Sequence, residues 1–358
     1  MDKLFRWGLI NIWIAILLSA CSSGSAPPNG LGDTTTSRVY IGGYYYDGSN
    51  SRAFYWTDNN STPTTLGAPG LDSIIYALTV SGGHVYTSGY IFDGSNHRAC
   101  YWTGNNTTPT IVGAAGKDSE AWGIAVSGGH VYTAGWYFDG SDGRACYWTD
   151  NNTIPTILGT PGQETMAHAL VVADGHVYTA GSYYDVPNYR ACYWMDNNTT
   201  PIILGTPGQD SFATALAVSG SSVYTSGAYR DGPYFRACYW TDNNTTPTTV
   251  GASGRSSFAN ALVFFKGSIY SAGWYIDGSY SQACYWKDNN TVPTTVGIPG
   301  QESIARALVI ADGHVYTAGY YYDGLTFLRA CYWVDNNTMP TTVGPPGVSS
   351  SAHALIVQ

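Results

Sequence analysis

Charged side chains are scarce in this 358-residue chain, where Asp, Glu, Lys and Arg together make up 11% of the residues. Only 15 residues are Lys or Arg against 24 that are Asp or Glu, so the formal net charge is −9. No basic cluster occurs beyond the first few residues. A nucleic-acid-binding face needs such a cluster, so this class of partner is excluded. The shortage of charge does not indicate disorder, because aromatic residues reach 15% and have apolar area to bury.

The one long apolar run stands at the N-terminus. The segment WGLINIWIAILL follows Lys3 and Arg6, and LSAC follows it at Leu18–Cys21. This pattern predicts a secretory signal over residues 1–20 and resembles a bacterial lipobox, in which Cys21 becomes the mature N-terminus and carries lipid such as palmitate. The alternative is an uncleaved membrane helix, but the run is shorter than the ~20 residues that a span needs.

The next segment, residues 21–38, is rich in Ser, Gly, Pro and Thr and is typical of a flexible tether. Ser22 after the cysteine resembles the outer-membrane sorting pattern of enteric-type bacteria. We therefore expect a lipid-anchored monomer in the bacterial cell envelope, at the outer membrane or the cell surface, with the membrane as one partner.

An internal repeat of 46 residues fills the rest of the chain, residues 39–358. Motifs such as VYTAG mark the start of seven copies, at positions 39, 85, 131, 177, 223, 269 and 315. Each copy contains four short segments rich in Val, Tyr, Thr and Trp, which favour strands, separated by Gly, Asn, Asp and Pro, which favour turns. Four antiparallel strands every 40–50 residues predict an all-β fold, a seven-bladed β-propeller.

The two ends of the repeat region predict how the ring closes. The chain enters at a second blade strand, residues 39–46, and stops after a first blade strand, residues 354–357. No second blade strand follows the last strand, so its edge would be left unpaired. We predict that these two strands pair and close the ring. The alternative is an open solenoid, which requires capping repeats that the sequence lacks.

Two residue types recur at fixed positions in the predicted strands. A tryptophan occurs in every copy, at Trp56, Trp102, Trp148, Trp194, Trp240, Trp286 and Trp333. We expect packing between blades, with a sugar-stacking ladder as the alternative. A cysteine occurs in six copies, at Cys100, Cys146, Cys192, Cys238, Cys284 and Cys331. Equivalent strands of neighbouring blades lie too far apart for disulfides, so we expect buried free thiols and no metal site.

An Asp and an Arg also recur, from Asp47 and Arg52 to Asp323 and Arg329, but the sixth copy has Gln282 opposite Asp277. We expect an ion pair that braces the loop. Calcium binding is the alternative, although one carboxylate per loop is few for that ion.

The copies differ mainly on one face of the predicted ring, where the second strand turns into the third and where the fourth strand leads to the first strand of the next blade. One position beside the first strand is highly variable and reads Tyr76, Trp122, His168, Thr214, Asn260, Arg306 and His353. These residues are predicted to surround the mouth of the central channel and to bind a ligand there. Drift at an unconstrained loop is the alternative.

Catalytic signals are weak. Glu120, Glu164 and Glu302 lie near the same face, but no unique acid pair, nucleophile elbow or His/Cys/Asp constellation stands out. His168 and His353 are predicted to be polar lining residues, because most positions around a channel lie too far apart to share a metal. No catalytic residue, metal or other cofactor is predicted.

The repeat unit RACYWTDNNTIPTILGTPGQETMAHALVVADGHVYTAG resembles the bacterial HAF-type repeat, and the first copy reads AFYW at Ala53–Trp56. The resemblance implies an exported bacterial propeller and supplies no catalytic residues. It departs from the family pattern in having Cys for Phe and GHVYTAG at the turn.

Three functions follow as hypotheses. The first is a lipid-anchored binding or scaffold protein for a protein or glycan ligand. The second is a multivalent lectin with equivalent sites between blades. The third is a hydrolase or lyase acting on polysaccharide.

Overall fold

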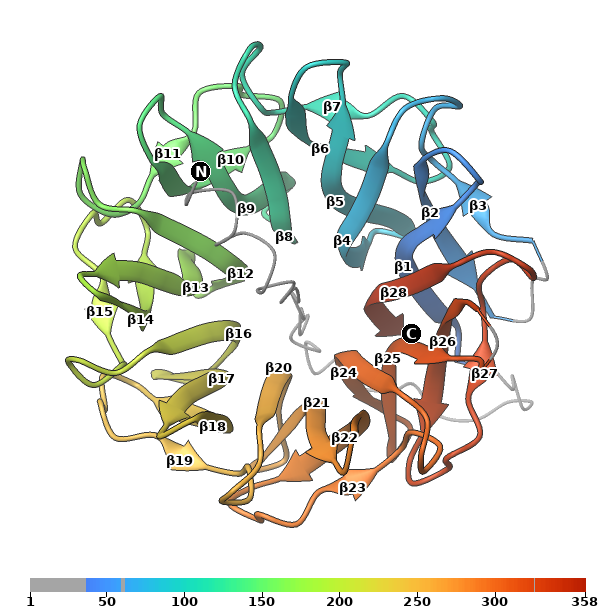
Figure 1. The fold of residues 1–358 in the computed structure, drawn as a ribbon. Coiled ribbons are helices and arrows are strands. Elements are labelled where there is room, and N and C mark those ends of the chain that lie inside the picture. The colour runs from blue at the N-terminus through green and yellow to red at the C-terminus, as the bar shows by residue number, and fades with distance from the viewer. Residues whose placement is uncertain (1–36, 59–61, 325) are drawn as a thin grey trace, which may run out of the picture.

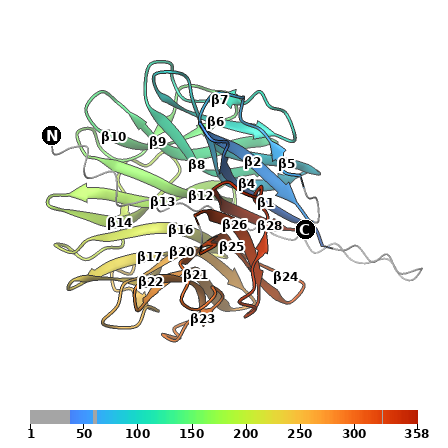
Figure 2. The ribbon, with the colours of Figure 1, turned by 45° about the vertical axis from the view of Figure 1, so that its right-hand side comes forward.

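The computed structural model describes residues 37–58, 62–324 and 326–358 as a ring of seven four-stranded antiparallel sheets. Figure 1 looks along the axis of the ring, and Figure 2, turned by 45°, shows the sheets fanned around it. The predicted signal segment 1–20 and the lipidation residue Cys21 lie outside the described residues, as does most of the tether. No helix long and apolar enough to cross a membrane occurs in the ranges described.

We name the strands of each blade A to D from the axis outward. The A strands are β28 (Ser350–Val357), β4 (Ser73–Ser81), β8 (Ser119–Ser127), β12 (Thr165–Ala173), β16 (Ser211–Ser219), β20 (Ser257–Phe265) and β24 (Ser303–Ala311). The B strands are β1 (Val39–Tyr46), β5 (His84–Phe92), β9 (His130–Phe138), β13 (His176–Asp185), β17 (Ser222–Asp231), β21 (Ser268–Asp277) and β25 (His314–Tyr322).

The C strands are β2 (Ser51–Thr57), β6 (His97–Thr103), β10 (Gly143–Thr149), β14 (Asn188–Met195), β18 (Tyr234–Thr241), β22 (Tyr280–Lys287) and β26 (Leu328–Val334). The short D strands are β3 (Thr64–Thr65), β7 (Thr110–Ile111), β11 (Thr156–Ile157), β15 (Ile202–Ile203), β19 (Thr248–Thr249), β23 (Thr294–Thr295) and β27 (Thr341–Thr342). Blade 1 is the sheet β28-β1-β2-β3, and blades 2 to 7 follow in chain order from β4 to β27.

The ring closes as the sequence predicts. Strand β28 pairs antiparallel with β1, with Tyr40 opposite Ile356 and Ile41 opposite Leu355. The strand is longer than expected, because it begins at Ser350 and not at residue 354. Closure gives both terminal edges a partner, so the open solenoid is wrong.

The repeated tryptophans pack between blades. Six of them are at most 1% exposed and Trp56 is 6% exposed, so the sugar-stacking alternative has no open ring face to use. Trp333 of blade 7, for example, packs with Ala261 and Val263 on the A strand of blade 6. The six repeated cysteines are free and buried, as predicted, and burial raises the pKa of each thiol.

A buried hydroxyl also links every pair of neighbouring blades. The first Ser or Thr of each A strand accepts the backbone N–H of the Ala in the preceding blade's C strand. Ser211 Oγ accepts the N–H of Ala191 at 3.0 Å, and Ser350 Oγ makes the same bond to Ala330 at 2.9 Å across the closure of the ring. All seven copies make this bond, so the link is part of the repeat itself.

The DNN part of the repeat forms the C–D turn. Its Asp adopts a left-handed backbone, with φ of 53° at Asp150. The carboxylate accepts the N–H of the first Val of the B strand, at 2.9 Å between Val131 N and Asp150 Oδ1. Asp tolerates this conformation better than most residues, which explains why it recurs there.

The Arg of RACYW braces the opposite edge of the blade. Arg190 Nη1 lies 2.9 Å from Asp185 Oδ2, and its Nε and Nη2 donate to the carbonyl oxygen of Gly205. The ion pair forms in six copies, at N–O distances from 2.9 to 4.0 Å, which confirms the predicted loop brace. In the sixth copy Gln282 donates instead to the carbonyl of Gln301.

Candidate functional site

One face of the ring carries the B–C hairpins and the segments that lead from a D strand to the next A strand. We name it the loop face, and we name the opposite face, with the A–B and C–D turns, the turn face. The differences among the seven copies concentrate on the loop face. A surface that varies over a constant scaffold is where a recognition site is expected.

The seven predicted ring residues occupy one structural position, a β-bulge in each A strand. In blade 4 the pairing of β12 with β13 passes from Ala167 to Ala169 and leaves His168 unpaired. In the other blades the register of the A and B strands skips the equivalent residue in the same way. These residues are the other six predicted ones, Tyr76, Trp122, Thr214, Asn260, Arg306 and His353. The structure therefore places all seven at the same point of the innermost strands, and ligand binding by them stays a prediction.

Several bulge side chains bond to the next blade. His168 Nδ1 donates to the carbonyl of Ala213 at 2.9 Å, and Thr214 Oγ1 donates to that of Ala259 at 2.7 Å. Asn260 Nδ2 donates to the carbonyl of Ala305 at 2.8 Å. Across the closure of the ring, His353 Nδ1 donates to the carbonyl of Ile75 at 3.0 Å. Each bond joins a bulge to the neighbouring one, so these polar atoms hold blades together.

The aromatic members of the ring pack on one another instead. The ring of Tyr76 stacks on His353 at 5.6 Å between centroids, and Trp122 stacks on His168 at 5.3 Å. Tyr76 and Trp122 meet edge to face at 6.5 Å. All seven residues are at most 8% exposed. The ring therefore presents little surface in this state, which the sequence did not indicate.

The carboxylate of Glu120 lies beside the aromatic residues of the ring. Glu120 Oε2 accepts the indole N–H of Trp122 at 2.8 Å, and Glu120 Oε1 lies 2.9 Å from Nδ1 of His97. The imidazole of His97 stacks on Tyr90 at 4.1 Å. Glu120 could be identified from the sequence, whereas His97, on the B–C side of the neighbouring blade 2, was not predicted. The one available signal was the SNH variant of that loop.

Burial and charge shift the histidines in opposite directions. Partial burial alone would lower the pKa of His97, but the hydrogen bond and charge of Glu120 outweigh it and raise that pKa. Burial lowers the pKa of His168 to about 4, against the effect of the Ala213 carbonyl. Burial, followed by the charge of Arg306, lowers the pKa of His353 well below its ordinary value. His97 is therefore the one of the three with both a raised pKa and an exposed side chain, 40% accessible.

The pKa of His168 predicts a pH-dependent stability. The folded chain protonates this side chain only near pH 4, whereas the unfolded chain does so near pH 6.5. Above about pH 6.5 the side chain is neutral in both states and does not lower stability. As the pH falls towards 4, the unfolded chain takes up the proton and the folded chain does not, so the free energy of unfolding decreases by about 3 kcal/mol. His168→Asn should fold at neutral pH, because Asn260 makes the equivalent bond in blade 6. Urea unfolding from pH 7.5 to 4 should show a shallower loss for the variant, and parallel curves would contradict the assignment.

The other two predicted glutamates do not join Glu120. Glu164 Oε1 accepts the hydroxyl of Tyr189 at 3.0 Å, and both residues belong to blade 4. Glu302 is exposed at the entry to blade 7. Within the described part of the chain, no group of three His, Cys, Asp or Glu side chains is placed to hold a metal ion.

Exposed aromatic side chains mark the rim of the loop face. Among the residues that the structure describes, the five most exposed are between 37% and 47% accessible, and all lie at the ends of B–C hairpins: Tyr46, Phe138, Tyr234, Tyr280 and Tyr322. On the turn face the exposed apolar side chains are aliphatic or Met, among them Ile154, Val292 and Met339. Accessible Tyr and Phe are typical of surfaces that bind proteins or sugars.

Comparison with known proteins gives the fold. No family model matches the sequence, and no curated protein matches it either. The likeness to HAF-type repeats therefore stays a prediction.

Solved structures with the same architecture include a puromycin-hydrolyzing peptidase of Mycobacterium tuberculosis, with a TM-score of 0.57 and 10% sequence identity over 85% of this chain. A puromycin hydrolase variant complexed with PGG has a TM-score of 0.61 and 12% identity over 86% of this chain. This chain covers 52% of each of those proteins, so it spans about half their length. At such identities the likeness shows the propeller fold alone.

Proposed function

We propose that this chain is an exported binding protein, anchored through lipid on Cys21 at the outer membrane or cell surface, that recognises a protein or glycan ligand with its loop face. The observation that carries the proposal is the coincidence, on one face, of the variable hairpins and the five most exposed aromatic side chains. The constant interior fixes the shape of the ring, while the hairpins above it are free to differ.

In this proposal the seven bulge residues form the floor below the hairpins. Trp122 and Arg306 are the members whose side chains are largest and most specific in chemistry. Arg306 stands over the ring of Tyr320, at 5.4 Å from guanidinium carbon to ring centroid. Ligand contact is expected at the rim, with the floor setting its geometry.

The proposal is tested by screening the protein on glycan and protein arrays and then measuring the ligand found. Phe138→Ser and Tyr280→Ser, on the loop face, should each weaken binding at least tenfold. An aromatic anchor that is buried in an interface contributes about 2 kcal/mol or more to the free energy of binding. Ile154→Ser and Met339→Ser, on the turn face, serve as matched controls and should leave affinity unchanged. On intact cells, Cys21→Ala should move the ligand-binding activity from the envelope into the medium.

Ring variants are drawn from residues that the repeat itself places at the same bulge. Trp122→Tyr copies Tyr76 and Arg306→Asn copies Asn260, so both should fold. Equal loss of affinity in loop-face and turn-face variants would refute recognition by the loop face. Binding at several equivalent sites per chain would indicate the multivalent lectin instead.

A hydrolase or lyase acting on polysaccharide is the second candidate, favoured by the contact between exposed His97 and buried Glu120. A carboxylate behind an imidazole is an arrangement that supports proton transfer. The same arrays separate the two functions, because a ligand that is recovered intact after binding excludes turnover.

A further inference from the structure

The sixth copy breaks the repeat at one corner of the loop face. Gln282 replaces the Arg that pairs with the hairpin Asp in the other six copies. Its amide donates to the carbonyl of Gln301 and does not reach Asp277. Among the seven described aspartates at this position, Asp277 is the one whose side chain makes neither an ion pair nor a hydrogen bond within the described residues. An exposed carboxylate is therefore released from its bracing role.

A second departure lies beside the first, in the segment leading into blade 6. Asp72, Asp118 and Asp210 hold this position in three other blades, and each accepts the backbone N–H that opens the preceding C strand, as Asp210 does for Tyr189 at 3.0 Å. Blade 6 has the shorter, neutral Ser256 there. The neighbouring Arg255 lies over the ring of Tyr275 at 5.8 Å, and no carboxylate oxygen of the described residues lies within 4.0 Å of its guanidinium nitrogens.

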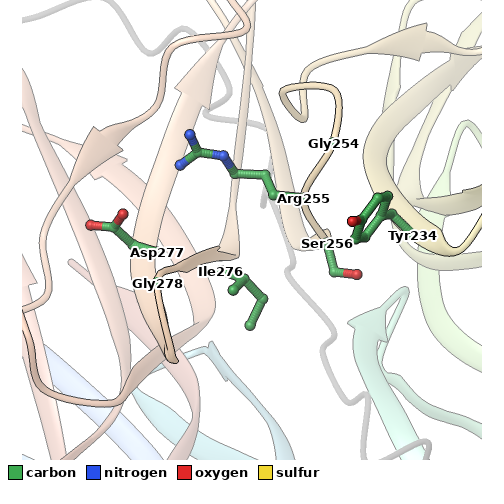
Figure 3. A pocket seen from close by; sticks show the side chains of 7 residues that line it. All are labelled: Tyr234, Gly254, Arg255, Ser256, Ile276, Asp277 and Gly278. Atoms are coloured by element: carbon green, nitrogen blue, oxygen red, sulfur yellow. The ribbon is translucent and has the colours of Figure 1, made fainter.

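Asp277, Ser256 and Arg255 line a pocket of about 370 Å³ between blades 5 and 6. Figure 3 shows Tyr234 of β18 on one side and Asp277, at the end of β21, on the other. The side chain of Arg255 extends from the loop between them towards the Asp277 side, and Ser256 and Ile276 complete the lining. The pocket thus offers one anionic group, one cationic group and one accessible aromatic ring.

We propose that this pocket binds an acidic pyranose, a uronic acid residue at the end of a glycan chain. The guanidinium of Arg255 suits a carboxylate, because its planar N–H groups match two carboxylate oxygens. Asp277 accepts hydrogen bonds from sugar hydroxyls, and the ring of Tyr234 packs on the apolar face of the sugar. The volume lies at the lower end of the range for small-ligand sites, which fits one or two sugar rings.

The net charge of the chain favours a short acidic ligand over a long one. A net charge of −9 repels a long polyanion, so a single acidic residue at a chain end is favoured over a continuous acidic polymer. The inference rests on the proposed function, because it names a substrate class for the loop face. The proposed function allows contact along the whole rim of the loop face, whereas this inference places the contact in the one pocket between blades 5 and 6.

The repeat supplies the decisive variant. Gln282→Arg restores the residue that six copies use to hold the hairpin Asp, so Asp277 should become paired and unavailable to the sugar. The variant should keep or raise its melting temperature while losing binding, and this separates loss of a ligand site from loss of folding. Met195→Arg, on the turn face, adds the same charge at a distance and is the matched control.

The measurement is calorimetric titration with methyl glucuronide, methyl galacturonide and neutral methyl glucoside, with glycine as a zwitterionic probe. A single residue should bind the wild type with a Kd of about 1 mM, as expected for a ligand of this size. Gln282→Arg should weaken uronide binding at least tenfold, and Arg255→Gln should abolish the preference for uronide over glucoside. Met195→Arg should match the wild type.

Three outcomes would overturn the inference: no saturable uronide binding, equal binding by Gln282→Arg, or tighter binding of glycine than of either uronide. If uronides fail to bind while the loop face binds another ligand and Phe138→Ser weakens it, this inference fails and the proposed function stands. If neither behaves as expected, both fail.

Discussion

A chain that ends at Ser349 is expected not to form a stable ring. The deletion removes β28, the innermost strand of blade 1, and leaves β1 with an unpaired inner edge. Ala352 and Leu355 pack in the core shared with blade 7, whereas Ala354 and Ile356 pack in the core shared with blade 2. One strand therefore supports two interfaces at once.

The expected size of the effect follows from the groups exposed. Burying one Leu or Ile side chain contributes about 1.5–3 kcal/mol, and two such chains are lost together with the ladder hydrogen bonds and the Ala330–Ser350 link. Proteins are stable by about 5–15 kcal/mol in total, so little stability remains. We expect no cooperative urea transition by circular dichroism and an enlarged or aggregated species by gel filtration.

The matched rescue places the same strand elsewhere. A permuted chain that carries residues 350–358 before Arg38, joined by the two-residue Gly-Gly turn that links Ser81 to His84 in blade 2, restores every sheet. It should unfold cooperatively near the wild-type midpoint. A truncated protein with a wild-type midpoint would show that closure by β28 contributes little.

The architecture could be predicted from the sequence because each copy repeats the same local pattern of strand and turn residues. The constant Trp, the Asp of the C–D turn and the Arg–Asp pair all have the roles that their positions suggest. Ring closure followed from the order of strands at the two ends. The start of β28 was placed four residues late, because the bulge at His353 interrupts the alternation on which such a boundary depends.

The candidate site could be predicted in position but not in environment. Variation identified the bulge residues, yet their burial depends on how neighbouring blades meet, and a single sequence does not contain that. The bond of His168 to Ala213 joins residues one full repeat apart, and the contact of His97 with Glu120 joins two blades. Gln282 was visible as an exception, but its consequence required Arg255 and Ser256 to be placed beside Asp277.

The conversion of Gly181 to Ala in β13 is expected to destabilise the ring severely. Gly181 pairs with Ala167 next to the bulge of β12, and a Cβ at this position would lie 1.8 Å from the backbone carbonyl oxygen of Met166. Backbone cannot swing aside as a side-chain end can. Equivalent contacts of 1.7 to 2.0 Å occur at the glycines of the other B strands, at Gly43, Gly89, Gly135, Gly227, Gly273 and Gly319. The bulge in the A strand therefore leaves room only for a glycine opposite it, which is why every copy has glycine at this point of its B strand.

Overpacking usually costs 1–3 kcal/mol, and relief here requires the bulge itself to move, so we expect a loss of about 4 kcal/mol or more in the free energy of unfolding. Gly123→Ala is the matched control, since the other six copies already have Ala at that position and the nearest backbone atom, Leu170 N, would be 3.0 Å away. It should change stability by about 1 kcal/mol or less. Urea unfolding of the two variants compares them directly. Similar midpoints for both would mean that the bulge is a soft feature, and the floor beneath the loop face would then lack the rigidity that recognition by the hairpins requires.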